Sequence, residues 1–529
     1  MKLQFSIKPQ VFQIILLLVI GLLLRLPMLQ LGLWRDEAST YFDSIPNNFK
    51  EIINTVIHSE LNPPVFFMIM HQWIKYFGSN EIVFKIPALL FGLLLIPSNY
   101  VLGTLTGSSN AGLIAATIAT FSYNSVYYSQ EARPYTLTAL LCCWVMFFYC
   151  KSLDSTNKSQ NWYIFAFTIC SAILLYVQYT GLLLVIVLTT VTYGLSFKKS
   201  INLPLKLFAI SFSMIFMIFT PWLGIFLIHL NTGLPWQAKS LFLEVLFSNI
   251  YYTLFNPKIL VLSVVLLGAI ITIRKYLIQS NSAIHSSNLF PYIYTFVFGL
   301  TFLLVIIVQS FLSQRGRYVI PFTPIAWAFY GSCLNNLFQY LSQSIHKIYD
   351  GKFLIITKKY VTIFIIFVAL LLNKYNLDFT NIDKSGIRSL VAYIERRNNI
   401  DKSLYILSPD YFGPTFGYYT INHPKIFYGF GRWDRPEIFS PEGYAEIWDN
   451  PTLMADTELS IQKEIDKGFR KLALIQERTT LSDAGKMKYS KANQFLDRLK
   501  KKYTLLEKTD YLGENESVSL YLFDTKISP

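Results

Sequence analysis

Long apolar stretches are the feature that most constrains this 529-residue chain. About eleven windows, most of roughly 17–25 residues, have the length and composition of helices that cross a lipid bilayer. The windows cover residues 11–31, 82–104, 110–128, 134–150, 161–176, 180–197, 204–226, 258–277, 290–310, 318–339 and 360–373. The chain is 53% hydrophobic and 15% charged, whereas soluble domains average about 25% charged residues. We therefore predict an all-α polytopic membrane domain over residues 1–373.

The basic residues fix the expected orientation of this domain. Residues 1–373 carry 23 Lys and Arg against 10 Asp and Glu. With a cytoplasmic N-terminus, the inside loops collect eleven of these basic residues, which is the positive-inside pattern. Residues 374–529 are nearly neutral, with 23 basic against 22 acidic groups. The net charge of +14 therefore reflects membrane topology and does not indicate nucleic-acid binding. We expect a multi-pass protein of the cell membrane.

Acidic residues gather on the opposite, extracytoplasmic face. Eight of the ten acids before residue 374 are expected there: Asp36, Glu37, Asp43, Glu51, Glu60, Glu81, Glu131 and Glu244. Acids hardly influence topology, so their one-sided distribution indicates a function. The first external loop, about residues 32–81, contains two segments with helical apolar spacing, 47–58 and one opened by Pro63 and Pro64. We expect both helices to lie in the membrane interface.

After residue 374 the composition changes to that of a soluble domain. Helical patterns at 387–397 and 458–471 alternate with strand patterns at 403–409, 471–476 and 517–524. This segment contains no cysteine, since all five cysteines fall in the predicted spans. We predict a small extracytoplasmic α/β domain over residues 374–529.

The pair Asp36 and Glu37 directly follows the first apolar window. Neighbouring positions on a helix point about 100° apart, so one carboxylate could act as a base while the other holds a partner or a metal ion. The alternative is that the pair stabilises the N-terminus of a helix, where acidic residues are favoured.

A second group, His58 and Glu60, precedes the paired prolines. Glu60, with His58, could complete an acidic or metal-binding pocket opposite Asp36, and a divalent metal ion is the one cofactor that the residues suggest. The alternative is a solvated loop that happens to carry polar residues.

Two further groups lie at the expected outer ends of spans. Gln130, Glu131 and Arg133 sit at membrane depth, where charged groups usually face a cavity; the alternative is a surface ion pair of Glu131 with Arg133. Arg315 and Arg317 could grip the phosphate of a lipid, or else anchor Tyr318 at the interface. Two tyrosines beside these motifs, Tyr135 and Tyr318, complete the expected substrate pocket.

Four segments, LWRDEAST, ELNPPVFFMIMHQWIKYFGSNEIVFKIPALLFG, YYSQEARPYTL and GRYVIPFTPIAWA, follow one another as in the glycosyltransferases of family 39. The resemblance covers roughly residues 10–340. It implies the GT-C fold: a helical bundle with a reaction chamber at its outer face, a sugar donor on a polyprenyl phosphate, and inversion at the anomeric carbon. Asp36 matches the base that activates an acceptor hydroxyl, and Glu37 its companion. Arg133 and Arg317 match positions that neutralise the leaving lipid phosphate.

The chain also departs from that family. Relatives often place Asp or His just before the paired prolines, where this chain has Glu60-Leu61-Asn62, which argues against a metal ion there. The acceptor is left open between a glycan, a lipid and a protein.

Three other functions compete with the transferase. A ligase or polymerase of lipid-linked oligosaccharides faces the same phosphate chemistry. A flippase or transporter of lipid-linked sugars would show inverted repeats and charge deep in the bilayer, and no repeat is visible. A structural membrane protein would leave the one-sided acids unexplained.

Overall fold

The structure is a computed structural model that describes residues 9–153, 159–197, 203–232, 241–254, 258–280, 290–312, 316–346, 383–397, 403–434, 436–440, 450–478 and 483–527. The chain divides into two compact units. The helical unit comprises residues 1–29, 85–222 and 240–379, and the sheet unit comprises residues 30–84, 223–239 and 380–529.

The helical unit contains most of the predicted spans. Its elements are α1 (Pro9–Arg25), α5 (Glu81–Thr104), α6 (Ser109–Phe121), α7 (Tyr123–Tyr128), α8 (Tyr135–Ser152), α9 (Gln160–Val177), α10 (Thr180–Ser196), α11 (Leu205–Thr232), α12 (Phe242–Thr253), α13 (Lys258–Ser280), α14 (Phe290–Phe311), the 3-10 helix η3 (Gly316–Phe322) and α15 (Thr323–His346). Among the described residues, α1, α5, α8, α9, α11 and α14 are long and apolar enough to cross a membrane. The chain is thus a multi-pass membrane protein.

Ten of the eleven apolar windows coincide with these helices, and the window at 360–373 lies outside the described residues. Two windows are corrected in detail. The window at 110–128 is broken at Ser122 into α6 and α7. The window at 318–339 begins as the 3-10 helix η3, which contains Pro321, and becomes α-helical only at Thr323. Proline lacks the N–H that a continuous α-helix would need at that point.

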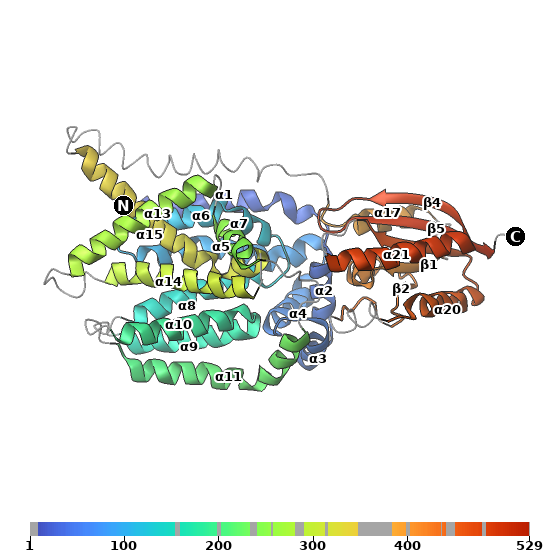
Figure 1. The fold of residues 1–529 in the computed structure, drawn as a ribbon, viewed down its shortest axis with the longest axis horizontal. Coiled ribbons are helices and arrows are strands. Elements are labelled where there is room, and N and C mark those ends of the chain that lie inside the picture. Colours follow the sequence, from blue (N-terminus) through green and yellow to red (C-terminus); the bar gives the residue numbers. More distant parts are fainter. Residues whose placement is uncertain are drawn as a thin grey trace, which may run out of the picture. The chain divides into compact units, whose positions relative to one another are not determined.

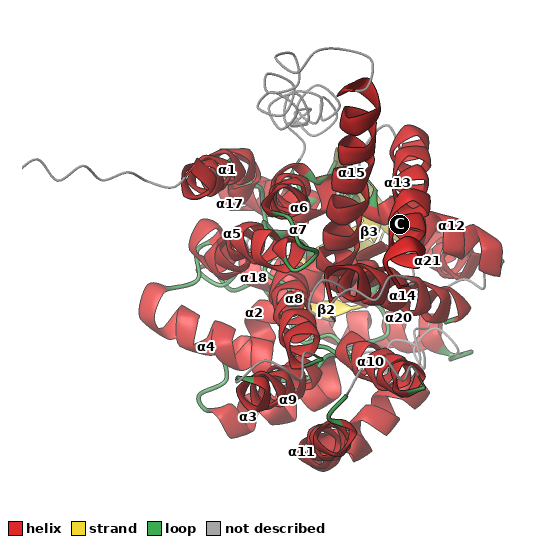
Figure 2. Ribbon diagram, turned by 90° about the vertical axis from the view of Figure 1, so that its left-hand side faces the viewer, coloured by secondary structure: helices red, strands yellow, loops and turns green. Residues whose placement is uncertain are grey.

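Small residues allow the helices of this unit to pack closely, as is usual between membrane helices. A Cβ on Gly112 would collide with the carbonyl of Tyr100 in α5, and one on Gly331 of α15 would collide with the carbonyl of Ala111 in α6. Helices α8, α9, α10 and α14 run side by side, and Figure 2 looks approximately along them.

A buried arginine stabilises the break between α6 and α7. The last carbonyls of a helix have no helical N–H partner, and in lipid an unsatisfied carbonyl costs several kcal/mol. Arg25, which is fully buried, donates to the carbonyls of Ala119 (3.1 Å) and Thr120 (3.3 Å) at the end of α6. It also donates to the hydroxyls of Ser125 (2.9 Å) and Ser129 (3.0 Å). Arg25 therefore connects the end of α1 to the segment that leads to Gln130.

The sheet unit is built on a five-stranded mixed sheet of order β2-β1-β3-β5-β4. Strands β1, β2, β4 and β5 are labelled in Figure 1. The strands are β1 (Ser403–Ser408), β2 (Phe427–Gly429), β3 (Lys471–Glu477), β4 (Tyr503–Tyr511) and β5 (Val518–Ile527). β1 pairs parallel with β2 and β3, and β5 pairs antiparallel with β3 and β4. The strands predicted at 403–409, 471–476 and 517–524 are confirmed.

Helices cover both faces of this sheet. Helices α17 (Gly386–Arg396) and α18 (Gly413–Tyr419) bury one face with Tyr405 and Leu407, whereas α20 (Leu453–Asp466) and α21 (Asp483–Lys502) bury the other with Leu404 and Ile406. Burial of alternate residues on opposite faces explains why the centre of the predicted strand, residues 404–407, is apolar.

The sheet unit also includes residues 30–84, which sequence analysis assigned to the membrane domain. This segment forms α2 (Arg35–Ser44), α3 (Phe49–Ser59) and α4 (Val65–Phe77), so the two helices predicted there are confirmed as helices. Asn48 caps α3 by accepting from the backbone N–H of Glu51 (3.0 Å) and donating to its carboxylate (2.6 Å). Gly78, with a φ of 85°, ends α4.

Glu516, just before β5, is a buried carboxylate in this unit. It accepts from the backbone N–H of Arg35 (3.0 Å) and from the Thr415 hydroxyl (3.2 Å). Burial raises the pKa of Glu516 to about 7, although the charge of Arg35 and the hydrogen bonds it accepts favour the ionised form.

We predict that Arg25→Met lowers the free energy of unfolding by about 3 kcal/mol, because buried carbonyls and hydroxyls lose their donor. Titration of purified protein in mixed micelles with sodium dodecyl sulfate measures the change. Leu23→Met, on the exposed side of the same helix, is the control and should unfold like the wild type. Equal stability of the two variants would contradict the role of Arg25.

We also predict that the stability of the sheet unit decreases as pH rises from about 4.5 to about 7, because the folded state binds the Glu516 proton more tightly than the unfolded state. The shift corresponds to a contribution on the order of 3 kcal/mol. In thermal unfolding of the full chain in detergent, Glu516→Gln should therefore lose less stability than the wild type between pH 5 and pH 8. Glu514→Gln, at an exposed position nearby, should follow the wild type.

Candidate active site

The pair Asp36 and Glu37 lies in the first turn of α2, in the sheet unit. The two carboxylates have different surroundings. Asp36 is 14% exposed, with Oδ1 3.3 Å from Nε of Arg35. Glu37 is fully buried, and its Oε2 lies 3.1 Å from Nζ of Lys384, which is also fully buried. The two neighbours therefore serve different tasks: Asp36 lies near the surface, whereas Glu37 forms an internal ion pair.

The alternative that the acidic pair caps its own helix is supported only in part. Both acids lie in the first turn, where negative charge is favoured. The N-cap residue itself is Trp34, which makes no side-chain cap hydrogen bond. The carboxylate that accepts the first N–H of α2 comes from Glu516.

His58 and Glu60 end α3. His58 is exposed, whereas Glu60 is 8% exposed and accepts from the Asn62 amide at 3.1 Å. In the part of the chain that the structure describes, no three His, Cys, Asp or Glu side chains come close enough together to hold a metal ion. The metal-binding role of His58 and Glu60 therefore stays a prediction, and we assign no chemical step to a metal ion.

The helical unit brings two of the predicted motifs together. Tyr128 and Tyr135, which flank the QEARP segment, pack against Ile320 of η3 in one buried cluster. Tyr252 of α12 joins this cluster, with its hydroxyl 2.7 Å from that of Tyr128. Segments nearly 190 residues apart in the sequence therefore meet in this cluster.

The polar residues of the QEARP segment are buried in the helical unit. Gln130, Glu131 and Arg133 are at most 6% exposed. Burial of this kind excludes the surface ion pair that sequence analysis left as an alternative for Glu131 and Arg133. A buried charge in a membrane protein usually faces a cavity or another polar group.

Arg317 and Tyr318 lie in η3 and are both partly exposed. The guanidinium carbon of Arg317 is 5.7 Å from the centroid of the Tyr318 ring, which is within cation–π range. Gln309 of α14 donates to the Tyr318 carbonyl at 2.6 Å. This arrangement is compatible with both alternatives: Arg317 could bind the phosphate of a lipid, or it could anchor Tyr318 at the interface. Arg315 lies outside the described residues.

The site residues predicted from sequence thus fall into two sets. Asp36, Glu37, His58 and Glu60 belong to the sheet unit. Gln130, Glu131, Arg133, Tyr135, Arg317 and Tyr318 belong to the helical unit.

Several residues near these sets were missed by sequence reasoning. Lys85 is a fully buried cation near the start of α5. A lysine inside the apolar window at 82–104 was the sequence feature that could have identified it. Asn124 donates to the carbonyl of Tyr252 at 2.5 Å. Lys384 and Glu516 lie in a segment whose sequence carries no motif, so no local pattern indicates their contacts.

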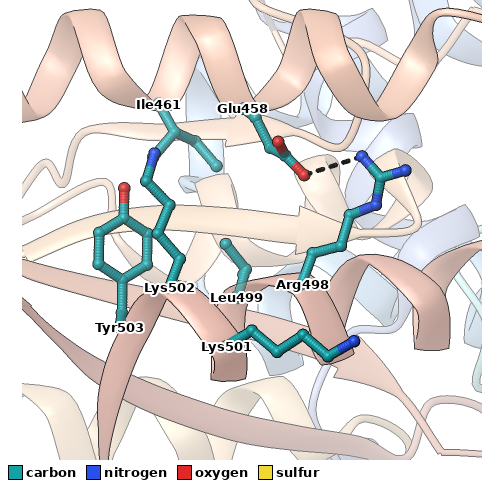
Figure 3. Close-up of a pocket in the computed structure, with 7 residues that line it drawn as sticks. All are labelled: Glu458, Ile461, Arg498, Leu499, Lys501, Lys502 and Tyr503. Atoms are coloured by element: carbon teal, nitrogen blue, oxygen red, sulfur yellow. Dashed lines mark hydrogen bonds and ion pairs between the residues drawn. The ribbon is translucent and has the colours of Figure 1, made fainter. Parts of the chain in front are cut away.

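A shallow basic pocket occupies another part of the sheet unit, between α20 and α21 (Figure 3). Its cations include Arg498, which is paired with Glu458 at 3.2 Å, and Lys502, which donates to Gln462 at 3.0 Å. Because they lie in the last turns of α21, these cations stabilise the negative end of the helix dipole. This explanation accounts for them without a ligand.

No protein-family model matches the chain, and no curated protein matches it by sequence. Among solved structures, ArnT from Cupriavidus metallidurans in the apo state is similar with a TM-score of 0.57 and 11% identity, over 98% of this chain and 98% of that chain. The same ArnT bound to undecaprenyl phosphate gives a TM-score of 0.55 and 11% identity, over 97% of each chain. The Archaeoglobus fulgidus oligosaccharyltransferase in the apo form gives 0.58 and 11%, over 90% of this chain and 70% of that chain.

Identity this low shows the fold alone. The chain therefore shares the fold of ArnT and of the archaeal oligosaccharyltransferase. This fold agrees with the helical bundle expected from sequence, while membership of the GT-C superfamily and of family 39 stays a prediction.

Proposed function

We propose that this protein is a membrane glycosyltransferase that moves a sugar from a polyprenyl-phosphate donor to an acceptor hydroxyl at the extracytoplasmic face. The observation that carries the proposal is a fold similar to that of ArnT over nearly the whole chain, with one ArnT structure binding undecaprenyl phosphate. A partly exposed Asp36 beside a buried ion pair supplies the base that such a reaction needs. About eleven spans, a cytoplasmic N-terminus and an external C-terminal domain complete the proposal.

Asp36 is the proposed base. The acceptor hydroxyl transfers its proton to the Asp36 carboxylate as its oxygen attacks the anomeric carbon. The bond from that carbon to the phosphate oxygen breaks, and the electron pair leaves with the lipid phosphate, so the configuration inverts. A carboxylate base of this kind contributes roughly 10²–10⁴-fold to the rate.

Arginines hold the proposed leaving group. Charge develops on the phosphate in the transition state, and preorganised guanidinium groups stabilise it there more than in the ground state. Arg133 and Arg317 are the candidates, and Arg315 is retained as a third. We propose that Gln130 and Glu131, which are buried and lie close to Arg133 in the sequence, line the substrate pocket. Glu60 is proposed as a further pocket residue.

The structure changes the role that we assign to Glu37. Sequence analysis paired it with Asp36 as a second catalytic carboxylate. Because Glu37 is fully buried against Lys384, we propose that it positions α2 and does not touch the substrate.

A second candidate function is transfer of a preassembled oligosaccharide by a ligase-type reaction. The similarity to the archaeal oligosaccharyltransferase favours this alternative. The two functions share the proposed base and phosphate grip and differ in the size of the transferred glycan, which mass spectrometry of the product distinguishes.

We predict that Asp36→Asn lowers kcat by at least about a hundredfold, because the amide cannot accept the acceptor proton. Transfer is measured with purified protein in detergent and candidate polyprenyl-phosphate sugars, with the product identified by mass spectrometry. Glu51→Gln, an exposed acid-to-amide change on α3, is the matched control and should retain wild-type kcat. Near wild-type transfer by Asp36→Asn would remove the base assignment.

We also predict that Arg317→Gln weakens the binding of undecaprenyl phosphate about tenfold or more, because a charge-assisted hydrogen bond to phosphate contributes roughly 1.5–3 kcal/mol. Tryptophan fluorescence titration in detergent measures the Kd. Arg274→Gln, an equivalent change at an exposed position of α13, serves as the control. Equal Kd values for the two variants would show that Arg317 is an aromatic anchor and not a phosphate ligand.

A further inference from the structure

Helix α2, which carries Asp36, is not capped by the side chain of its own N-cap residue. Its N-cap residue, Trp34, makes no side-chain cap hydrogen bond. The first helical N–H, that of Arg35, donates instead to the Glu516 carboxylate at 3.0 Å. The side chain of Arg35 also lies over the Tyr411 ring, 4.5 Å from its centroid. The start of α2 is therefore fixed by Tyr411 and Glu516, which lie in the C-terminal part of the chain.

The backbone just before α2 is held in the same way. The N–H of Gly32 donates to the Asp383 carboxylate, and that of Leu33 donates to the Tyr419 hydroxyl at 2.6 Å. A Cβ at Gly32 would lie 2.5 Å from the Tyr419 hydroxyl and 2.9 Å from Asp383. Only glycine allows this close approach.

The ion pair of Glu37 with Lys384 adds a buried electrostatic constraint. Both side chains are fully buried and 3.1 Å apart. An isolated buried charge is strongly unfavourable, so each group requires the other. Because Glu37 is covalently next to Asp36, this pair fixes the rotation of the first turn of α2.

The other end of the loop is held by the same C-terminal segment. Glu81 accepts from Arg388 at 2.6 Å and from the Tyr419 hydroxyl at 2.7 Å. Arg388 also pairs with Asp383 at 3.0 Å. The entry and the exit of the loop of residues 32–81 therefore share the Tyr419 hydroxyl, and Arg388 links Asp383 at the entry to Glu81 at the exit.

These partners form one frame. The N–H groups of Glu514 and Asn515 donate to the carbonyls of Asp383 and Lys384 at 2.8 and 2.9 Å, and the N–H of Gly386 donates to the carbonyl of Glu516 at 2.8 Å. Lys384 and Glu516 are consequently carried on two short segments that are paired through their backbones.

From these contacts we infer that Lys384 and Glu516 are positioning residues for transfer: they lock the first turn of α2 so that the Asp36 carboxylate points at the acceptor hydroxyl. The inference rests on the proposed function of Asp36. It assigns a role to the C-terminal segment, which sets the geometry of the base. A displacement of about 1 Å at a reacting group can cost about a hundredfold in rate.

The charges around Asp36 give a readout that a purely structural role would not produce. Arg35, Glu37, Lys384 and Glu516 surround the first turn of α2. The packed helices add His71 of α4, which contacts the carbonyl of Ser44 at 2.9 Å, and Tyr418 of α18, whose ring meets that of Tyr41 at 5.2 Å. Of these groups, the Glu37–Lys384 pair can be made positive or negative by single substitutions.

The test compares Lys384→Met, Glu37→Gln and the double variant with the wild-type full chain in detergent. We expect Lys384→Met to lower kcat by about a hundredfold with little change in the donor KM. The same substitution should shift the acid limb of the pH–rate profile to higher pH. Glu37→Gln should shift that limb to lower pH, because Lys384 is left as an unpaired positive charge. The double variant, which removes both charges, should return the limb toward its wild-type position. Lys467→Met, an exposed Lys→Met control in the same unit, should change neither quantity.

A second measurement does not require activity. With Asp36→Cys as background, the rate of thiol alkylation at position 36 is followed against pH by mass spectrometry. Lys384→Met should raise the pKa of this thiol and Glu37→Gln should lower it. Wild-type kcat in Lys384→Met, or shifts of the same sign in both variants, would overturn the inference and leave the transferase intact. If the wild type transfers no lipid-linked sugar, the proposed function fails while the thiol measurement still decides the positioning role.

Discussion

A carboxylate leaves water only when another group satisfies its charge, and the arrangement around α2 depends on this constraint. Glu37 is fully buried and therefore needs Lys384, and Lys384 is buried and needs Glu37. Removing either partner leaves an uncompensated charge, which typically costs about 3–5 kcal/mol. Replacing both by apolar groups is often neutral. The pair thus contributes less to net stability than to selecting one position for the first turn of α2.

The helical unit meets an equivalent constraint with a different group. The break at Ser122 leaves carbonyls at the end of α6, and the guanidinium of Arg25 satisfies two of them. It also donates to Ser125 and Ser129 in the segment that follows, and to the carbonyl of Gly21 within α1. In both units, a charge brought from elsewhere in the chain fixes the backbone next to a motif that we assign to chemistry.

Sequence analysis identified features that are expressed within one stretch of the chain. Apolar windows predicted the helices because burial in lipid requires an unbroken run of apolar residues. The strands at 403–409 and 471–476 were visible for a similar reason, since both of their faces are covered by helices. β4 was missed because it is an edge strand whose sequence, YTLLEKTDY, does not alternate apolar with polar residues. The break at Ser122 was missed because the composition on both sides of it is continuous.

The partners of the candidate site could not be read in this way. Lys384 and Glu37 are 347 residues apart, and neither lies in a pattern that selects the other. Sequence reasoning could state that adjacent carboxylates point in different directions, and the structure gives them different surroundings. It could not state which one is buried, because that depends on where the C-terminal segment folds back.

This dependence has a consequence for how the C-terminal segment should be understood. A reacting base must be held more tightly than a surface loop holds its side chains, and α2 belongs to a loop whose two ends, near Gly32 and at Glu81, would otherwise be free to separate. The Tyr419 hydroxyl accepts from the N–H of Leu33 and donates to Glu81, and Arg388 donates to the carbonyl of Gln30 and to Glu81. These hydrogen bonds reduce that freedom. The buried ion pair then selects one rotation of the helix among those that remain. The C-terminal segment, which resembles an appended domain in the sequence, therefore holds the helix that carries the proposed base in one position.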